Sequence, residues 1–227
     1  EGEMAGRPEG GRSLDISSNP DEATAKALLA GSLSVPAGCR AANADEAAAA
    51  AEALGFPVAV KALGVAHKSE AGAVKLNLRD ADAVRAAALA MAGLGAGLYV
   101  ERMVTGGIGE LIVGVTRDPL FGPVMTVGTG GVMVELLQDT ATLLLPASRD
   151  VVEAALRGLK LFPLLDGFRG RPKADVGAAV DAVLGIADFA LSHAERLAEL
   201  DINPLIVCAE GEGAWVADAL IVLEQID

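Results

Sequence analysis

The apolar and polar positions of this chain follow two periods, one typical of strands and one typical of helices. Short apolar runs bounded by turn residues predict strands at 57–62, 74–78, 98–104, 110–116, 124–128 with a continuation over 132–137, and a hairpin over 206–218. Longer amphipathic runs predict helices at 21–30, 46–54, 81–94, 150–160 and 176–191. The expected N-caps are Asn19 or Asp21, Asp45 and Asp80. This order predicts a mixed chain with several hairpins rather than a regular strand–helix alternation.

The C-terminal hairpin carries a candidate metal site. Residues two apart on a strand point to the same side, so Asp201 and Asn203 are expected to share a face. A turn about residues 210–211 would place Asp218 opposite Asn203. Carboxylate and amide oxygens without Cys or His suit Mg²⁺. The same alternation also fits a half-exposed strand that binds no metal.

Lys61 stands near the end of a strand that is otherwise apolar on both faces. A fully buried lysine is unfavourable without a partner, so a phosphate group is a natural ligand for it. The alternative is a lysine on an edge strand whose ammonium reaches solvent.

A polar loop over residues 64–72 follows this strand and contains His67, Lys68 and Gly72. A glycine-bearing loop between two strands can turn its N–H groups toward phosphates as an anion nest, although this one is not a P-loop sequence. His67 is a candidate phosphoryl acceptor or, equally, an exposed loop histidine. Glu101 and Met103 alternate along a strand and either frame an adenine or reflect ordinary strand patterning.

Composition restricts the classes of partner. Net charge is −13, which argues against a nucleic-acid surface but not against a nucleotide held by a lysine pair and Mg²⁺. Hydrophobic residues make up 52% and aromatic residues 3%, so the core is expected to consist of Ala, Val and Leu. No apolar run approaches the roughly 20 residues that span a bilayer, and the polar start lacks a signal-peptide core. We expect a cytoplasmic chain with no membrane contact, and its Cys39 and Cys208 as buried thiols.

Eight stretches, taken in order, resemble the ATP-grasp domain of ADP-forming acyl-CoA (acetyl-CoA) synthetases, the beta-type subunit related to succinyl-CoA synthetase. They are GFPVAVK (55–61), HKSEAG (67–72), VERMV (100–104), ELIVGVTRDP (110–119), FGPV (121–124), GTGGV (128–132), GFRGRP (167–172) and ELDINPL (199–205). Each stretch alone is weakly specific, whereas the ordered set is specific. The resemblance covers roughly residues 20–223.

The resemblance implies an α+β fold, the ATP-grasp fold, with two α+β lobes and a nucleotide cleft between them. The expected division is a disordered lead-in at 1–19, a small lobe at 20–98 and a large lobe at 99–227. ATP or ADP is expected to contact six residues: Lys61, Glu101, Met103, Glu110, Lys68 and Gly72. Mg²⁺ is expected on Asn203 and Asp218, and the catalytic roles fall to His67, as a phosphoryl carrier, and Asp201, which faces a phosphohistidine.

The reaction implied is acyl-CoA + ADP + phosphate ⇌ acid + CoA + ATP. The family's CoA-binding and primary phosphohistidine domains do not match this sequence, so the expected partner is a subunit or domain that carries them. Two positions depart from the family pattern: Ala73 replaces a second glycine and Leu143 replaces an arginine. These departures favour a second hypothesis, a non-catalytic or regulatory nucleotide-binding module of a larger protein such as an acyltransferase fusion.

Overall fold

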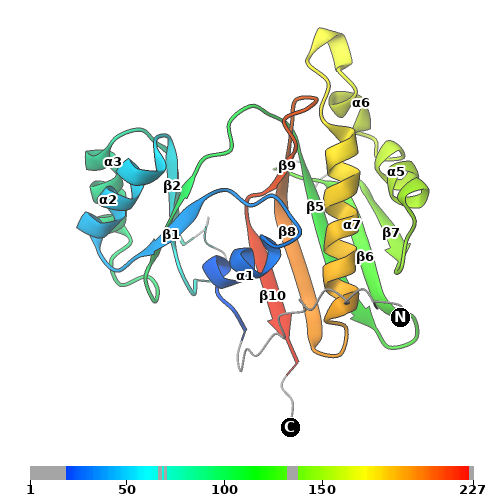
Figure 1. The fold of residues 1–227 in the computed structure, drawn as a ribbon, viewed down its shortest axis with the longest axis horizontal. Helices are drawn as coiled ribbons and strands as arrows, with labels where there is room; N and C mark the ends of the chain where they lie inside the picture. The colour runs from blue at the N-terminus through cyan, green and yellow to red at the C-terminus, as the bar shows by residue number, and fades with distance from the viewer. Residues whose placement is uncertain (1–18, 66–67, 69–70, 132–137, 225–227) are drawn as a thin grey trace, which may run out of the picture.

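The computed structural model describes residues 19–65, 68, 71–131 and 138–224. Residues 1–18 of the disordered lead-in expected over 1–19, His67 and the predicted strand over 132–137 lie outside the described residues. In the described part, two antiparallel sheets, each with its own helices, stand side by side with helix α1 (Glu22–Leu29) between them (Figure 1).

The smaller sheet lies at the left of Figure 1. Its strands run in the order β1-β4-β2-β3: β1 (Gly38–Ala41), β4 (Leu98–Arg102), β2 (Val58–Ala62) and β3 (Val74–Leu78). Helices α2 (Ala44–Leu54) and α3 (Ala81–Ala90) cover one face, through an apolar cluster that contains Ala47, Ala51, Val84 and Met91. Small alanine side chains let these helices approach the sheet closely.

The larger sheet is ordered β10-β8-β5-β6-β7, with β9 paired to β8. Its strands are β10 (Ala219–Leu223), β8 (Leu197–Cys208), β5 (Gly107–Asp118), β6 (Gly122–Thr129), β7 (Thr140–Leu144) and β9 (Ala214–Val216). Helix α7 (Val176–Ser192) crosses one face, with α5 (Arg149–Arg157), α6 (Phe162–Leu165) and the short turn η1 (Phe168–Gly170) beside it (Figure 1). This layer buries the larger core, which also takes in Leu29 of α1.

The chain passes from the smaller sheet to the larger one between Arg102, the end of β4, and Gly107, the start of β5. The expected lobe boundary after residue 98 falls inside β4, and every paired residue of β4 belongs to the smaller sheet. Three residues of the turn predicted over 106–109 belong to β5 instead, which begins at Gly107 rather than at Glu110, because Gly107 already pairs with Cys208. Strand β1 has no counterpart among the predicted elements.

The helix caps correct one expectation. Asp21 and Asp80 cap α1 and α3 as predicted, by accepting the N–H of Thr24 and Ala83. Helix α2, in contrast, is capped by Asn43 and not by Asp45, because Asn43 accepts the Glu46 N–H while the Glu46 carboxylate accepts the Ala42 N–H. This arrangement is a variant of the capping box, with its acid three residues after the cap but bonded to the N–H of the residue before it.

The pairing of strand β8 with β5 shifts register near Asn203. Val113 of β5 pairs with Ile202 and Leu111 with Leu205, so β8 holds one extra residue between these pairs. Pro204 lies in this interval and has no N–H to give to the ladder. A bulge of this kind re-aims the neighbouring side chains, and here the neighbour is Asn203.

The structure bears on the expectations about membrane-spanning helices and about the two cysteines. Within the described residues, no helix is long and apolar enough to cross a membrane. Both cysteines are free thiols. Cys208 is buried as predicted, but the prediction was wrong for Cys39, which is exposed because β1 lies at the edge of its sheet.

Candidate nucleotide and metal site

A cavity of about 500 Å³ lies between the two sheets. This volume falls within the range of about 300 to 1,000 Å³ that small-molecule sites occupy. Its walls bring together residues that are far apart in the chain, and seven of the predicted site residues are among them: Lys61, Lys68, Glu101, Met103, Glu110, Asn203 and Asp218. Their convergence is what the sequence motifs predict, while the role of each residue remains a prediction.

The smaller sheet supplies the cations. Lys61, on β2, is 5% exposed, so the alternative of a lysine reaching solvent from an edge strand does not apply: β2 is an inner strand between β4 and β3. Its ammonium donates to Glu22 at 2.6 Å and to the Ala217 carbonyl at 2.7 Å. Lys68 follows in the loop after β2 and contacts both Glu22 and Asp218. Two ammonium groups therefore meet at the cavity from one side.

The larger sheet supplies the candidate oxygen ligands. Asn203 and Asp218 face each other across the β8–β9 hairpin, and the Asn203 N–H donates to the Asp218 carbonyl at 3.3 Å. This confirms the predicted pairing, which follows from the turn about residues 210–211. The Lys68 ammonium lies 2.8 and 3.0 Å from the two carboxylate oxygens of Asp218.

These oxygen ligands fit a magnesium ion. No group of three or more His, Cys, Asp or Glu side chains suited to a metal occurs among the residues that the structure describes. One carboxylate and one amide oxygen are nevertheless sufficient, since Mg²⁺ usually takes one or two protein carboxylates and completes its shell with water and phosphate oxygens. The donor set is hard and free of sulfur, as that ion requires.

Helix α1 contributes two charged residues that the sequence motifs do not include. Glu22 and Lys26 form an i,i+4 ion pair at 3.1 Å, and their side chains are 3% and 1% exposed. Glu22 contacts Lys61 and Lys68, while Lys26 contacts Glu101 and the Ala217 carbonyl. The sequence holds a signal for them: Glu22 and Lys26 continue the spacing of the buried Leu29 and Leu33, so two charges occupy an apolar stripe.

The pKa values of these groups follow from burial and from their neighbours. Burial alone would raise the pKa of Glu22, but Lys61, Lys26 and Lys68 together lower it to about 2. Burial would likewise lower the pKa of Lys61, but Glu22, Glu101 and Asp218 raise it above its ordinary value. The pKa of Lys26 is lowered, because burial and the charge of Lys61 outweigh the attraction of Glu101 and Glu22. Lys61 is therefore a charged cation at neutral pH.

Three predicted residues stand apart from this convergence. Gly72 is exposed in the turn before β3 and does not line the cavity. Asp201 lies on the face of β8 opposite the core residues Leu200 and Ile202, which agrees with a face shared with Asn203, but it does not line the cavity either. Burial, Glu199 and Asp218 raise the pKa of Asp201. His67 lies outside the described residues.

Glu110 and Met103 are each fixed by backbone contacts. The Gly130 N–H donates to the Glu110 carbonyl at 2.6 Å, and a Cβ on Gly130 would lie 2.9 Å from Glu110 backbone and side-chain carbon. Only glycine permits this approach. The Met103 N–H is already used, since it donates to the Pro57 carbonyl at 3.0 Å. An adenine at this position would therefore have to use another backbone group.

The two departures from the family pattern lie in apolar surroundings. Ala73 is fully buried and belongs to the core of the smaller sheet. Leu143, on β7, is 8% exposed and belongs to the core of the larger sheet. Neither residue lines the cavity between the sheets.

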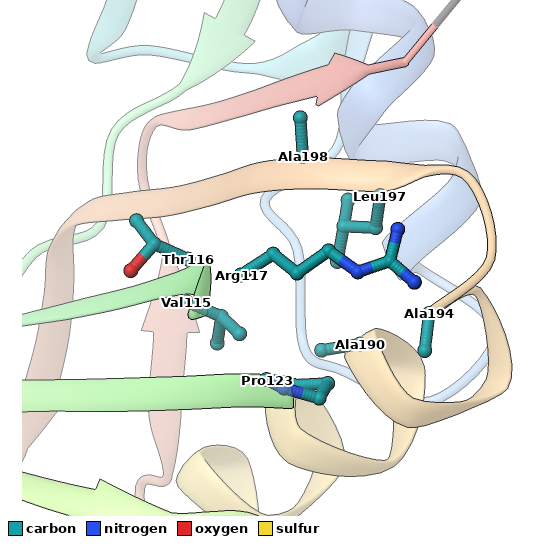
Figure 2. A pocket seen from close by; sticks show the side chains of 8 residues that line it. All are labelled: Val115, Thr116, Arg117, Pro123, Ala190, Ala194, Leu197 and Ala198. Atoms are coloured by element: carbon teal, nitrogen blue, oxygen red, sulfur yellow. The ribbon is translucent and has the colours of Figure 1, made fainter. Parts of the chain in front are cut away.

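Figure 2 shows a second recess. Its lining residues stand at the opposite ends of β5 and β8 from those that line the first cavity. It lies beside the end of β5, where the Arg117 side chain extends over Ala194 and Leu197. Its volume of about 10 Å³ is room for a single water molecule. The Arg117 guanidinium is paired with Glu224 at 3.2 Å. This recess holds no ligand site.

Fold and site together define an ATP-grasp domain, and the comparison with known families agrees: residues 17–223 match the ATP-grasp domain family, to which the chain belongs. Within it, the chain is 34% identical over 208 residues to the beta subunit of acetate–CoA ligase (ADP-forming) II of Pyrococcus furiosus, covering 87% of this chain and 88% of that subunit. The chain thus belongs to the family of these ligase subunits, and the resemblance and fold read from the motifs are confirmed.

Two further comparisons bear on the extent of the chain and on its site. It is 38% identical over 221 residues to acetate–CoA ligase (ADP-forming) of Methanocaldococcus jannaschii, which covers 92% of this chain but only 31% of that protein. The acetyl-coenzyme A synthetase 1 of Ca. Korarchaeum cryptofilum superposes with a TM-score of 0.79 and 34% identity, over 91% of this chain and 93% of that one. That structure contains coenzyme A and Mg-AMPPCP, with a phosphohistidine segment pointing towards the nucleotide binding site.

Proposed function

We propose that this chain is the nucleotide-binding component of an ADP-forming acyl-CoA ligase. It binds Mg-ATP or Mg-ADP between its two sheets and exchanges a phosphoryl group, through His67, with a histidine of a CoA-binding partner subunit or domain. The observation that carries the proposal is the convergence of Lys61 and Lys68 with Asn203 and Asp218 on one cavity. The setting is the cytoplasm, where free thiols persist.

Each wall of the cavity has a distinct part in this proposal. Lys61 holds phosphate oxygens, and Asn203 and Asp218 hold Mg²⁺, which supplies charge neutralisation for the transferred phosphoryl group. Lys68 now neutralises Asp218. When nucleotide enters, the phosphate oxygens offer its ammonium another acceptor, and the Asp218 oxygens become available to the ion.

The phosphoryl step needs positioning more than covalent chemistry from the protein. In the direction of ATP formation, the P–N bond of a phosphohistidine breaks and a P–O bond to the ADP β-phosphate forms. Asp201, on the same face of β8 as Asn203, orients the phosphohistidine. The substrate acid is selected by the partner, since the residues that would bind CoA belong to it.

Nucleotide-dependent thermal stability tests the binding step. A nucleotide at 100 times its dissociation constant stabilises the folded state by about 2.7 kcal/mol. We expect Mg-ADP to raise the melting temperature of the wild type and of the exposed-lysine control Lys75→Met, but not of Lys61→Met. An unchanged wild-type melting temperature at millimolar Mg-ADP and Mg-ATP would contradict the proposal.

Transfer of label from γ-labelled ATP to the partner tests the catalytic step. We expect label on the partner's histidine with wild-type chain and none with His67→Asn. Nucleotide binding without transfer to a cognate CoA-binding partner would instead support a regulatory nucleotide-binding module.

A further inference from the structure

Glu22 and Lys26 of α1 lie beneath the cavity and do not line it. Each of them contacts residues that do. The Glu22 carboxylate accepts from Lys61 at 2.6 Å and also contacts Lys68, whereas the Lys26 ammonium contacts Glu101. Both are almost completely buried, so they act on a ligand in this cavity only through these neighbours.

The charges in this cluster cancel. Three carboxylates (Glu22, Glu101 and Asp218) face three ammonium groups (Lys26, Lys61 and Lys68) within the described part of the chain. Glu22 and Lys26 are the members of the cluster that do not line the cavity between the sheets, although Lys26 lines a separate recess beside Tyr99. A substitution at either one therefore changes the charge beneath the cavity by one unit and leaves every cavity-lining side chain in place.

Anchoring of the helix does not require this arrangement. A buried ion pair is often no more stabilising than apolar residues of similar size, and Leu29 on the same face anchors α1 in the larger core without any charge. Lys26 also touches both lobes, since its ammonium contacts Glu101 of β4 and donates to the Ala217 carbonyl of the segment between β9 and β10. Glu22 contacts the two ammonium groups that line the cavity, Lys61 and Lys68, and Lys26 contacts the cavity-lining Glu101 and, at 5.7 Å, the ring of Tyr99.

We propose that Glu22 and Lys26 are positioning residues that set the charge beneath the cavity and act on nucleotide affinity in opposite directions. This rests on the proposed nucleotide site. Glu22 competes with phosphate oxygens for Lys61 and Lys68, so Glu22→Gln leaves the cluster one charge more positive and tightens nucleotide binding. Lys26→Gln leaves it one charge more negative and weakens binding. The double variant restores neutrality and returns the affinity to that of the wild type.

Calorimetric titration with Mg-ADP at constant ionic strength tests this inference. We expect the dissociation constant to fall about tenfold in Glu22→Gln and to rise about tenfold in Lys26→Gln, because one unit charge acts over a short, water-poor path. The exposed residues Glu52 and Lys75 give matched controls, Glu52→Gln and Lys75→Gln, with unchanged constants.

A structural role alone would weaken binding in both single variants, and that outcome would overturn the inference. Should Lys26→Gln fail to fold, the comparison of Glu22→Gln with the charge-balanced double variant replaces it, and a double variant that binds as tightly as Glu22→Gln is then the contradicting result. If the wild type itself binds no Mg-ADP, the proposed function fails instead of this inference.

Discussion

The two walls of the cavity differ in charge and in exposure. The smaller sheet presents Lys61, which is 5% exposed and held by Glu22 and Glu101. The larger sheet presents Asn203, which is exposed, and Asp218, whose side chain is 34% exposed. The difference matches the two halves of a metal–nucleotide complex: phosphate oxygens are held by a fixed, buried cation, whereas Mg²⁺ keeps several of its waters and needs an open position.

The largest expected effect concerns the buried side of this comparison. Lys26→Met removes one of the two buried cations that contact both Glu22 and Glu101, the other being Lys61. Removing one partner of a buried pair costs about 3 to 5 kcal/mol. Chemical denaturation measures the loss, with the exposed Lys75→Met as a control that changes stability by less than about 0.5 kcal/mol. A loss below about 1 kcal/mol would show that the cluster contributes little to the fold.

Nucleotide affinity is the next most sensitive quantity. Lys61→Met removes a charged donor from the phosphate side, and hydrogen bonds to charged groups contribute about 1.5 to 3 kcal/mol each. We expect the dissociation constant for Mg-ADP to rise about 100-fold by calorimetric titration. Asp218→Asn, on the open side, is expected to weaken binding only when Mg²⁺ is present. Equal effects of Asp218→Asn with and without Mg²⁺ would remove the distinction between the walls.

Close packing at Glu110 predicts a smaller loss of stability. In Gly130→Ala the new Cβ would lie 2.9 Å from Glu110 atoms, and overpacking of this kind costs about 1 to 3 kcal/mol. Gly31→Ala is the matched control, because a Cβ there meets nothing within 4 Å. Equal unfolding free energies for the two variants would contradict the close approach of Gly130 to Glu110.

We expect low pH to reduce the free energy of unfolding through protonation of Glu22. Its pKa is about 2 in the folded chain against an ordinary 4.5, and a lowered carboxyl pKa stabilises the fold above pH 4.5 and loses that contribution as pH falls towards 2. The difference in unfolding free energy between the wild type and Glu22→Gln is therefore largest above pH 5 and shrinks towards zero near pH 2. A difference independent of pH would contradict the ion pairs of Glu22.

The smallest expected effect lies on the larger sheet. Burial, Glu199 and Asp218 raise the pKa of Asp201, so its carboxylate is less stable in the folded chain than in the unfolded chain. We expect Asp201→Asn to increase the unfolding free energy at pH 7 by about 0.5 kcal/mol, through relief of like-charge repulsion. Phosphoryl transfer to the partner should fall in the same variant. Destabilisation by Asp201→Asn, measured by denaturation, would argue for a structural role instead.

The sequence predicts the site better where strand geometry alone determines position. The pairing of Asn203 with Asp218 follows from a turn at residues 210–211 and the two-residue period of a strand, and the structure has it. Lys61 stands out because a lone lysine in an apolar strand needs a partner. Both arguments use only local rules, which the folded chain obeys.

The sequence does not predict contacts that depend on how the lobes come together. The spacing of Glu22 and Lys26 on the apolar stripe of α1 indicates that they are buried, but it does not identify their partners, which lie as much as 191 residues away. Strand β1 is short and exposed in three of its four positions, so its sequence has no apolar pattern from which a strand could be predicted. Its pairing with β4 is set by the neighbouring strand rather than by its own residues.

The most direct test of the account is the position of a manganese ion that replaces Mg²⁺ in crystals grown with ADP, located by its anomalous scattering. We predict one strong peak about 2.1 to 2.2 Å from oxygens of Asn203 and Asp218, with the ADP phosphates beside Lys61 and the Lys68 ammonium moved off Asp218. A bound ADP with Lys68 still on Asp218, or a manganese peak away from this hairpin, would contradict the account.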